Sequence, residues 1–374
     1  MIPDPFLGLA KRQSLHTPRM AVAKPPIQLR LNQGDEVDGR YLVVKKLGEG
    51  GCGMVFRCQL KRNPVELVAV KILENPSDLE RFQREIDVIK GVQSPHVVGF
   101  RHDGQHLHFR YLAMEHMNGG SLRDYLDSKK TLPVKEAAWI AIMALRGLQD
   151  CGTVHRDLKP ENLLISKGPD NKVGFIIGNT KKASVVKVAD FGLAKQPDPK
   201  RTKLTMTGQI MGTPLYMSPE QCTNTKVVDV RGDIYSMGVL LYEMVTGDTP
   251  FTANDPYVLI DLHQKKEPTF PRMDLQMKAV IERCLKKNPD RRYPRLKDLE
   301  NDLCQIAGIG RGKGRSPAPA GGATSGLGEA TRWSLVIGGV VVFCVLAYVL
   351  RDQLFAAVDA YLGPPPTGKS APKR

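Results

Sequence analysis

The chain has 374 residues, of which 41% are hydrophobic and 25% charged, so it can bury a sizeable core and is not a disordered polypeptide. Its seven cysteines are scattered and form no C-x-x-C pair, which argues against a disulfide framework or a zinc site and favours a reducing compartment. The net charge is +15, and more than half of this excess lies outside residues 35–306. Basic flanks favour anionic lipid as a partner, and no interleaving of basic and aromatic residues indicates nucleic-acid binding.

The first part of the chain combines an irregular segment with a glycine-rich one. Residues 1–34 are rich in proline and basic residues and show no periodicity, which predicts a flexible arm. From Gly39 an alternating strand runs into Gly48, Gly50 and Gly53, which form the pattern G-x-G-x-x-G. Glycines let the backbone approach phosphate groups closely, and their amides can donate hydrogen bonds to them.

The glycine pattern alone has two interpretations, because dinucleotide-binding folds use it as well. In those folds the glycines open a helix. Here Met54–Leu60 reads as a second strand, so the sequence favours a hairpin that covers a nucleoside triphosphate.

The next strand presents a lysine. Leu67–Leu73 is apolar apart from Lys71, and a lysine in such a strand is costly to bury without partners. Phosphates and a carboxylate from the following helix, Leu79–Val92, are its expected neighbours. Glu80 and Glu85 are both candidates on that helix.

Three further elements precede the most informative stretch. A strand is predicted at Phe109–Met114, and the sequence GGSLRDYL predicts a helix with Ser121 as its N-cap. The apolar segment Ala137–Gly147 predicts a helix that supports the stretch after it.

Val154–Leu164 reads VHRDLKPENLL and contains the side chains that phosphoryl transfer requires. Asp157 can orient a hydroxyl nucleophile and accept its proton, and Lys159 can neutralise charge on a phosphoryl group in transit. Asn162 offers an amide oxygen suited to a hard cation such as Mg²⁺.

The C-terminal part of the chain contains an insertion and an apolar segment. The Ser166–Ser184 stretch is long, and its Val173–Ile177 run predicts an added hairpin strand, with a tolerated surface insertion as the default interpretation. Residues 307–332 are rich in Gly, Pro and Ala and predict a flexible linker. Residues 333–350 carry no charge and are long enough to span a bilayer, which leaves a short tail at 351–374.

The eight residues from His155 to Asn162 match H-R-D-L-x-x-x-N, and the stretch resembles the catalytic loop of the eukaryotic-type protein kinases. The resemblance covers residues 35–306, with every motif in the family's order. Lys159 in DLKPEN matches the pattern of the family's serine/threonine branch. The sequence GTPLYMSPEQ and the single span predicted after the domain resemble those of the bacterial membrane-anchored members. The resemblance implies a two-lobed α+β fold, with a small β-rich N-lobe, a larger helical C-lobe and one C-terminal transmembrane helix.

The resemblance also implies an ATP site between the lobes. The backbone of Glu115–Met117 would hydrogen-bond the adenine, with Met114 behind it. The residues implied to contact ATP are Leu47, Gly48, Gly50, Gly53, Val55, Ala69, Lys71, Met114, Glu115 and Met117.

The resemblance implies four catalytic residues. The VHRDLKPENLL stretch supplies Asp157 and Lys159, and Lys71 and Glu85 complete the set. The family pattern favours Glu85 as the partner of Lys71, because REIDVIKGV resembles the family's αC helix. It assigns Mg²⁺, with Mn²⁺ as the second option, to Asn162 and to Asp190 of the D-F-G motif.

Three residues are implied to have structural roles. Glu220 would form an ion pair with Arg292, and Asp233 resembles the buried aspartate that braces the catalytic loop from below.

The activation segment implies regulation by phosphorylation. Thr205 and Thr207 resemble the paired phosphothreonines of bacterial kinases, and Arg156 would contact the phosphate. The alternative is that Thr205 and Thr207 are polar loop residues without a regulatory role. Thr213 would hydrogen-bond the catalytic-loop side chains instead of accepting phosphate.

The sequence therefore predicts a protein serine/threonine kinase that is anchored in the cell membrane by a single span, with its kinase domain in the cytoplasm. Protein substrates and self-association for autophosphorylation are the expected partners, and nucleic acid is not. One alternative is a catalytically inactive kinase-like scaffold or nucleotide sensor. Another is a small-molecule phosphotransferase, which the full activation segment Asp190–Glu220 argues against.

Overall fold

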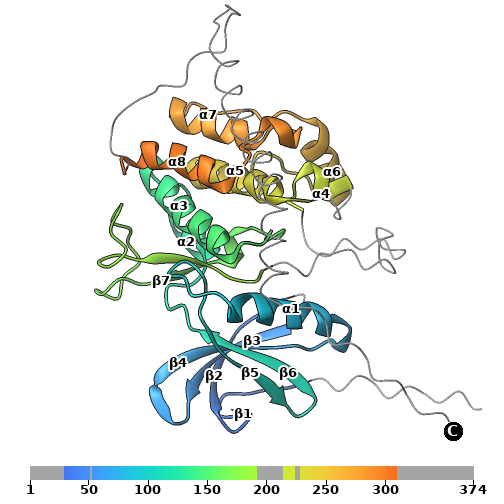
Figure 1. The fold of residues 1–374 in the computed structure, drawn as a ribbon, viewed down its shortest axis with the longest axis vertical. Coiled ribbons are helices and arrows are strands. Elements are labelled where there is room, and N and C mark those ends of the chain that lie inside the picture. The colour runs from blue at the N-terminus through green and yellow to red at the C-terminus, as the bar shows by residue number, and fades with distance from the viewer. Residues whose placement is uncertain (1–28, 51–52, 192–213, 224–227, 310–374) are drawn as a thin grey trace, which may run out of the picture. The chain divides into compact units, whose positions relative to one another are not determined.

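The structure is a computed structural model that describes residues 29–50, 53–191, 214–223 and 228–309. A small lobe of strands with one helix precedes a larger helical lobe (Figure 1), which confirms the predicted two-lobed α+β fold. The elements in chain order are β1 (Glu36–Val37), β2 (Tyr41–Gly50), β3 (Gly53–Leu60), β4 (Asn63–Ile72), α1 (Leu79–Lys90), β5 (Phe100–His106), β6 (Phe109–Glu115), α2 (Leu122–Lys129), α3 (Val134–Cys151), β7 (Leu163–Ser166), β8 (Val185–Val188), α4 (Pro219–Thr223), α5 (Val230–Thr246), α6 (Pro256–Lys265), α7 (Leu275–Cys284) and α8 (Leu296–Ala307).

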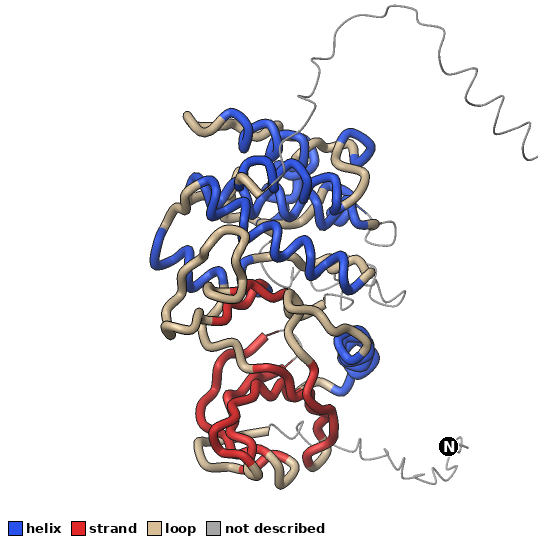
Figure 2. Tube along the Cα trace, turned by 60° about the vertical axis from the view of Figure 1, so that its left-hand side comes forward, coloured by secondary structure: helices blue, strands red, loops and turns tan. Residues whose placement is uncertain are grey.

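The small lobe is an antiparallel sheet in the order β1-β2-β3-β4-β6-β5. Alternate residues of β3 and β4 point into a core on one face, as the period of two predicts. In Figure 2 the sheet is red and α1 lies beside it in blue. The buried side chains of α1, Phe82, Ile86 and Ile89, join the core that continues into the large lobe. This shared core links the position of α1 to the large lobe.

The boundary predicted for the N-terminal arm is wrong at its end. Leu29 is buried, Leu31 packs against the small-lobe core, and the Gly34 amide donates to the Val43 carbonyl at 2.9 Å. Two apolar side chains and one backbone hydrogen bond therefore join residues 29–34 to the lobe. Residues 1–28 lie outside the described part of the chain.

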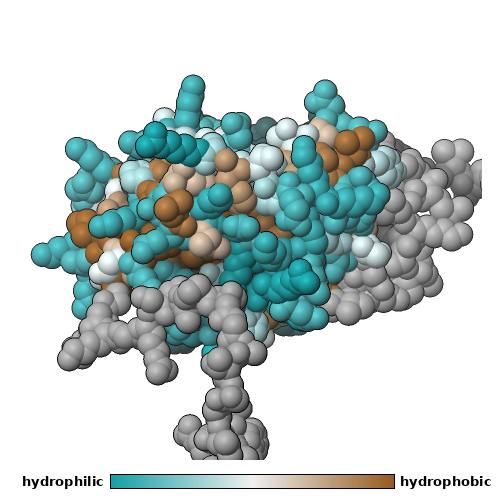
Figure 3. Space-filling model, turned by 90° about the horizontal axis from the view of Figure 1, so that it is seen from above, coloured by the Kyte–Doolittle hydropathy of each residue, from teal (hydrophilic) through white to brown (hydrophobic). Residues whose placement is uncertain are grey.

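The large lobe is built around α3 and α5. Both helices are buried over most of their length, and α8 packs along α3. Ser121 caps α2 in a reciprocal capping box with Asp124, which confirms the predicted N-cap. From the large-lobe end, the described surface is largely hydrophilic with apolar side chains exposed in places (Figure 3).

The insertion between β7 and β8 does not contain the predicted hairpin strand. Val173–Ile177 forms no strand, and the Ser184 amide donates to the Gly174 carbonyl at 2.8 Å. Val173, Phe175 and Ile177 instead pack partly buried against the large-lobe core, and the Phe175 ring meets Tyr125 of α2 edge-on at 5.7 Å. Packing of these side chains against the large-lobe core takes the place of the predicted strand pairing.

Among the described residues, no helix is long and apolar enough to cross a membrane. The predicted span at 333–350, the linker before it and the tail after it lie outside the described residues.

Candidate active site

Lys71 lies between two carboxylates that come from different parts of the chain. Its Nζ atom is 2.9 Å from both carboxylate oxygens of Glu85 on α1 and 2.6 Å from Oδ1 of Asp190, which follows β8. Glu80, the other candidate on the same helix, has a side chain 87% exposed and is 3.4 Å from Arg84. The structure therefore brings Glu85, and not Glu80, to the lysine.

The electrostatics of this cluster keep Lys71 charged. Burial would lower the pKa of its ammonium group, but the carboxylates of Asp190 and Glu85 outweigh that effect and raise the pKa. Burial raises the pKa of the Glu85 carboxyl, and Lys71 opposes it. Desolvation would raise the pKa of the Asp190 carboxyl as well, but the charge and hydrogen bond of Lys71 outweigh it, and the pKa falls.

The catalytic loop holds Asp157 by several short contacts. Lys159 Nζ lies 3.0 Å from Asp157 Oδ2, and Asn162 Nδ2 donates to the Asp157 carbonyl oxygen at 2.7 Å. The Asp157 amide donates to His155 Nδ1 at 3.3 Å, so His155 Nε2 carries the proton and donates to the Ala189 carbonyl at 3.0 Å. His155 thereby ties the catalytic loop to the residue before Asp190.

Asp233 braces this loop from α5. Its two carboxylate oxygens accept the backbone amides of His155 at 2.7 Å and Arg156 at 2.8 Å. Burial raises the pKa of Asp233, and the two amides counteract that effect. Arg156 has a left-handed φ of 65°, a conformation that is unfavourable for a side chain larger than glycine. The amide bonds to Asp233 hold the backbone in that conformation.

The donor set fits a hard divalent cation. Both neighbours of Asn162 Nδ2 are oxygen acceptors of Asp157, which fixes the amide orientation and leaves Oδ1 as an available ligand. The Asp190 side chain is 48% exposed and its Oδ1 atom is paired with Lys71. Its Oδ2 atom is therefore the second oxygen that can bind the cation. Two oxygen ligands, with water and phosphate oxygens for the remaining positions, suit Mg²⁺.

The glycine hairpin β2–β3 requires a glycine at one position. Gly53 has a φ of 137°, and a Cβ there would lie 1.9 Å from the carbonyl oxygen of Ile72. Gly50 pairs with Gly53 at the end of the hairpin, and Gly48 pairs with Val55.

The predicted adenine-binding residues lie along neighbouring strands and the lobe connection. Ala69 and Met114 are paired on β4 and β6 and are buried, as is Met117, whereas Leu47 is exposed. The Glu115 carboxylate is engaged by Lys187 Nζ at 2.7 Å. A nucleotide at the lobe connection would therefore meet the backbone of residue 115 and not its side chain.

The activation segment is described only in part. Thr205, Thr207 and Thr213 lie outside the described residues. Arg156 Nε is buried without a hydrogen-bond partner among the described residues, and Nη2 reaches the Val228 carbonyl at 3.5 Å.

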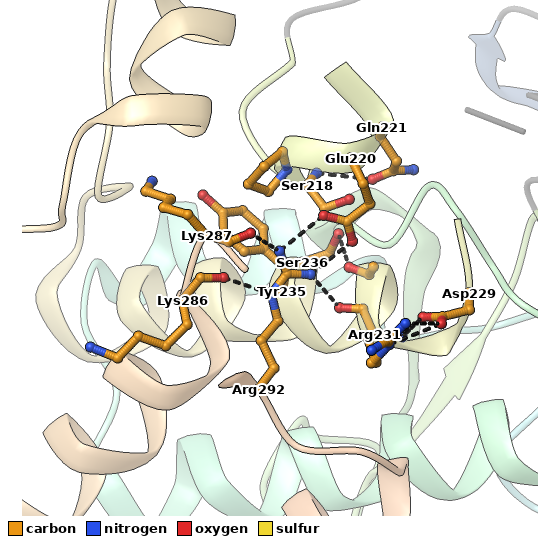
Figure 4. A network of polar contacts seen from close by, with 12 residues as sticks. Ser218, Glu220, Gln221, Asp229, Arg231, Tyr235, Ser236, Lys286, Lys287 and Arg292 are labelled. Atoms are coloured by element: carbon orange, nitrogen blue, oxygen red, sulfur yellow. Dashed lines mark hydrogen bonds and ion pairs between the residues drawn. The ribbon is translucent and has the colours of Figure 1, made fainter. Parts of the chain in front are cut away.

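The end of that segment is held by an ion pair. Arg292 donates from Nη1 and Nη2 to the two oxygens of Glu220 at 2.7 and 2.9 Å (Figure 4). The same guanidinium donates to the carbonyls of Arg231, Lys286 and Lys287.

Comparison with known proteins assigns the family. Residues 41–302 match the family described as "Protein kinase domain". The chain belongs to the protein kinase family.

The chain is also similar to bacterial members of this family. It is 32% identical to a probable serine/threonine-protein kinase of Clostridium perfringens, over 73% of this chain and 39% of that protein. It is 31% identical to the serine/threonine-protein kinases PknB of Mycolicibacterium smegmatis and Mycobacterium tuberculosis, over 71% of this chain and 43% of each. The chain thus spans about two fifths of the length of the curated relatives it matches.

Sequence reasoning missed two contacts of this kinase domain. Lys187 joins Glu115 across 72 residues, and Arg123 of α2 donates to Glu243 of α5 at 2.6 Å across 120 residues. No local pattern marks either pair, because each joins elements that meet only in the folded chain.

Proposed function

We propose that the chain is a protein serine/threonine kinase that transfers the γ-phosphoryl group of ATP to Ser or Thr hydroxyls of protein substrates. The main support is the position of Lys71, whose Nζ atom lies 2.9 Å from Glu85 Oε1 and 2.6 Å from Asp190 Oδ1. A fixed cation between the glycine hairpin and the catalytic loop is suited to the phosphates of ATP. The printed names of the bacterial relatives support the serine/threonine specificity.

The transfer proceeds through positioning and charge stabilisation. Asp157 orients the acceptor hydroxyl, whose oxygen bonds to the γ-phosphorus while the bond to the bridging oxygen of ADP breaks. The hydroxyl proton passes to the Asp157 carboxylate late in this step, and Lys159 neutralises charge on the phosphoryl oxygens. Asn162 and Asp190 would hold Mg²⁺ or Mn²⁺, which would neutralise phosphate charge.

Single-turnover transfer from labelled ATP to a protein tests the proposal against its rival. The rival, an inactive kinase-like scaffold or nucleotide sensor, would bind ATP without transfer. The presence of Lys71, Glu85, Asp157, Asn162 and Asp190 favours the active enzyme. ATP binding without labelled product, in the wild-type chain with Mg²⁺, would leave the scaffold as the function.

We extend the proposal to activation by phosphorylation at Thr205, Thr207 or both. Its support is Arg156, whose buried Nε lacks a partner among the described residues and suits a phosphate oxygen. We assign Thr213 to a hydrogen bond with the catalytic loop instead of to phosphorylation. Mass spectrometry of the ATP-treated kinase should find phosphate at 205 or 207, and unmodified threonines in a fully active enzyme would contradict the proposal.

We also propose that the kinase self-associates, so that one copy phosphorylates the activation segment of another. Active kinase mixed with an Asp157→Asn copy of different mass should phosphorylate Thr205 or Thr207 of the inactive copy. An inactive copy that stays unmodified would restrict the reaction to a single chain.

We further propose that residues 333–350 anchor the kinase in the cell membrane, with the kinase domain in the cytoplasm, where ATP is present. The support is an uncharged segment of bilayer length between Arg332 and Arg351. Protease added to spheroplasts should remove a tag at Arg374 and spare one at Met1. The reverse pattern would exclude this topology.

A further inference from the structure

Arg123, in the first turn of α2, lies beside the catalytic loop and is part of a network of acidic groups. Its Nη2 atom donates to Glu243 Oε1 at 2.6 Å and to the Tyr216 hydroxyl at 2.8 Å. Its Nε atom lies 3.5 Å from Glu161 Oε1. The Tyr216 hydroxyl in turn donates to the second oxygen of Glu243 at 2.6 Å. One guanidinium thus joins α2, α5, the catalytic loop and the end of the activation segment.

The network lies close to the position of the acceptor hydroxyl. Glu161 directly precedes Asn162, whose amide donates to the Asp157 carbonyl oxygen at 2.7 Å. A residue two or three positions from the acceptor in an extended substrate can reach about 7–10 Å from it. Side chains at such positions therefore come within range of Glu161 and the guanidinium beside it.

The two carboxylates differ in burial. Glu243 is buried and accepts hydrogen bonds from Arg123 and the Tyr216 hydroxyl, whereas the Glu161 side chain is 49% exposed. The Arg123 side chain is 28% exposed, so it is partly accessible to solvent although it is paired. The carboxylate of Glu243 outweighs burial and raises the pKa of Arg123, which stays charged.

A cavity begins at this network. Its volume is about 500 Å³, enough for a long side chain, and Arg123 and Glu243 form part of its wall. The other lining residues are Leu126, Asp127, Lys130, Thr131, Thr246, Gly247 and Asp248. Without Arg123, the carboxylates of Glu243, Asp127 and Asp248 would line this space with Lys130 as the remaining cation of the wall. Glu161, which does not line it, would lose its contact with the Nε atom.

We propose that Arg123 is a specificity-determining residue: its guanidinium occupies the subsite that a basic side chain of the protein substrate would otherwise take near the acceptor. The inference rests on the proposed kinase function. Because the chain supplies its own cation, an incoming Arg or Lys finds the carboxylates already paired and meets a like charge. The kinase therefore disfavours basic residues at the substrate positions that contact Glu161.

The test compares peptides that differ only in Arg or Ala at each position within three residues of a single Ser or Thr acceptor. The measured quantity is the ratio of kcat/KM for the Arg peptide to kcat/KM for the Ala peptide, which cancels any change in overall activity. In the wild type the ratio should be one or less at the positions near Glu161, two or three residues from the acceptor. In Arg123→Met it should rise about tenfold at one position, because an Arg side chain now meets unpaired carboxylates.

Three further variants make the result specific. Arg123→Lys keeps the charge and should keep most of the exclusion. Arg123→Met with Glu161→Gln should lose much of the gained preference. Arg101→Met removes an arginine paired with Glu66 at 3.7 Å on the small lobe and should leave the ratio unchanged.

The outcomes separate the inference from the function on which it rests. A wild type that phosphorylates Ala peptides, with the same ratios in Arg123→Met, overturns the inference and leaves the kinase function intact. A wild type that prefers Arg peptides and loses this preference on Glu161→Gln also overturns it, and this comparison does not depend on the folding of Arg123→Met. No transfer by the wild type to any peptide or protein overturns both.

Discussion

Removal of Glu220 from its ion pair with Arg292 should cost far more stability than removal of a partner from the exposed pairs around it. The Arg292 side chain is 0% exposed, and five hydrogen bonds join it to Glu220 and to three backbone carbonyls. Glu220→Gln would leave a buried guanidinium without its counter-charge. The cost of such a change is about 3–5 kcal/mol. For a domain of this size each kcal/mol shifts the melting temperature by about 2–4 °C, so Tm should fall by about 6 °C or more.

The matched control is Asp290→Asn. Arg231 lies 2.5 Å from Asp290, whose side chain is 80% exposed, and keeps Asp229 as a second partner. Exposed pairs contribute about 0–1 kcal/mol, so Tm should fall by no more than a few degrees. Differential scanning calorimetry of both variants at equal protein concentration measures the difference. Equal small falls in Tm in the two variants would refute the argument that burial of Arg292 makes the loss of the Glu220 charge costly.

Asp157→Asn should leave ATP affinity nearly unchanged and lower phosphoryl transfer about 100-fold or more, as nucleotide titration and single-turnover kinetics can test; near wild-type turnover would contradict the role of Asp157. Gly53→Ala should destabilise the small lobe by about 2 kcal/mol or more, because its Cβ would lie 1.9 Å from the Ile72 carbonyl oxygen; an unchanged thermal transition would be inconsistent with this clash. Burial lowers the pKa of His263 from 6.5 to about 4, so the folded state favours the neutral ring. Its contribution to stability is complete above about pH 6.5 and declines by about 3 kcal/mol as the pH falls to 4. His263→Gln should flatten the dependence of Tm on pH over this range, and an equally steep profile in that variant would argue against His263 as its source.

The sequence predicted the elements whose signal is local. The alternation of β3, the apolar run of β6 and the capping residue Ser121 are properties of neighbouring residues, and the structure has these elements within a few positions of the prediction. The catalytic loop is likewise contiguous, so Asp157, Lys159 and Asn162 could be grouped by spacing alone. In the structure Lys159 and Asn162 both contact Asp157.

The insertion shows where alternation is insufficient. Val173–Ile177 alternates like a strand, but a strand also needs a partner with free backbone groups. In the folded chain its apolar residues pack against the large-lobe core, with Phe175 on Tyr125 of α2, and the segment forms no strand.

Only the tertiary structure decided which distant charges meet. Glu80 and Glu85 lie roughly 140° apart around the same helix, so the packing of α1 determines which of them faces Lys71. Arg123 and Glu243 are 120 residues apart, and nothing within either helix predicts their contact. The sequence determined the local elements and the catalytic loop because their information lies within a few residues. The pairing of buried charges depends on the faces that the helices turn toward each other, which only the packed core fixes.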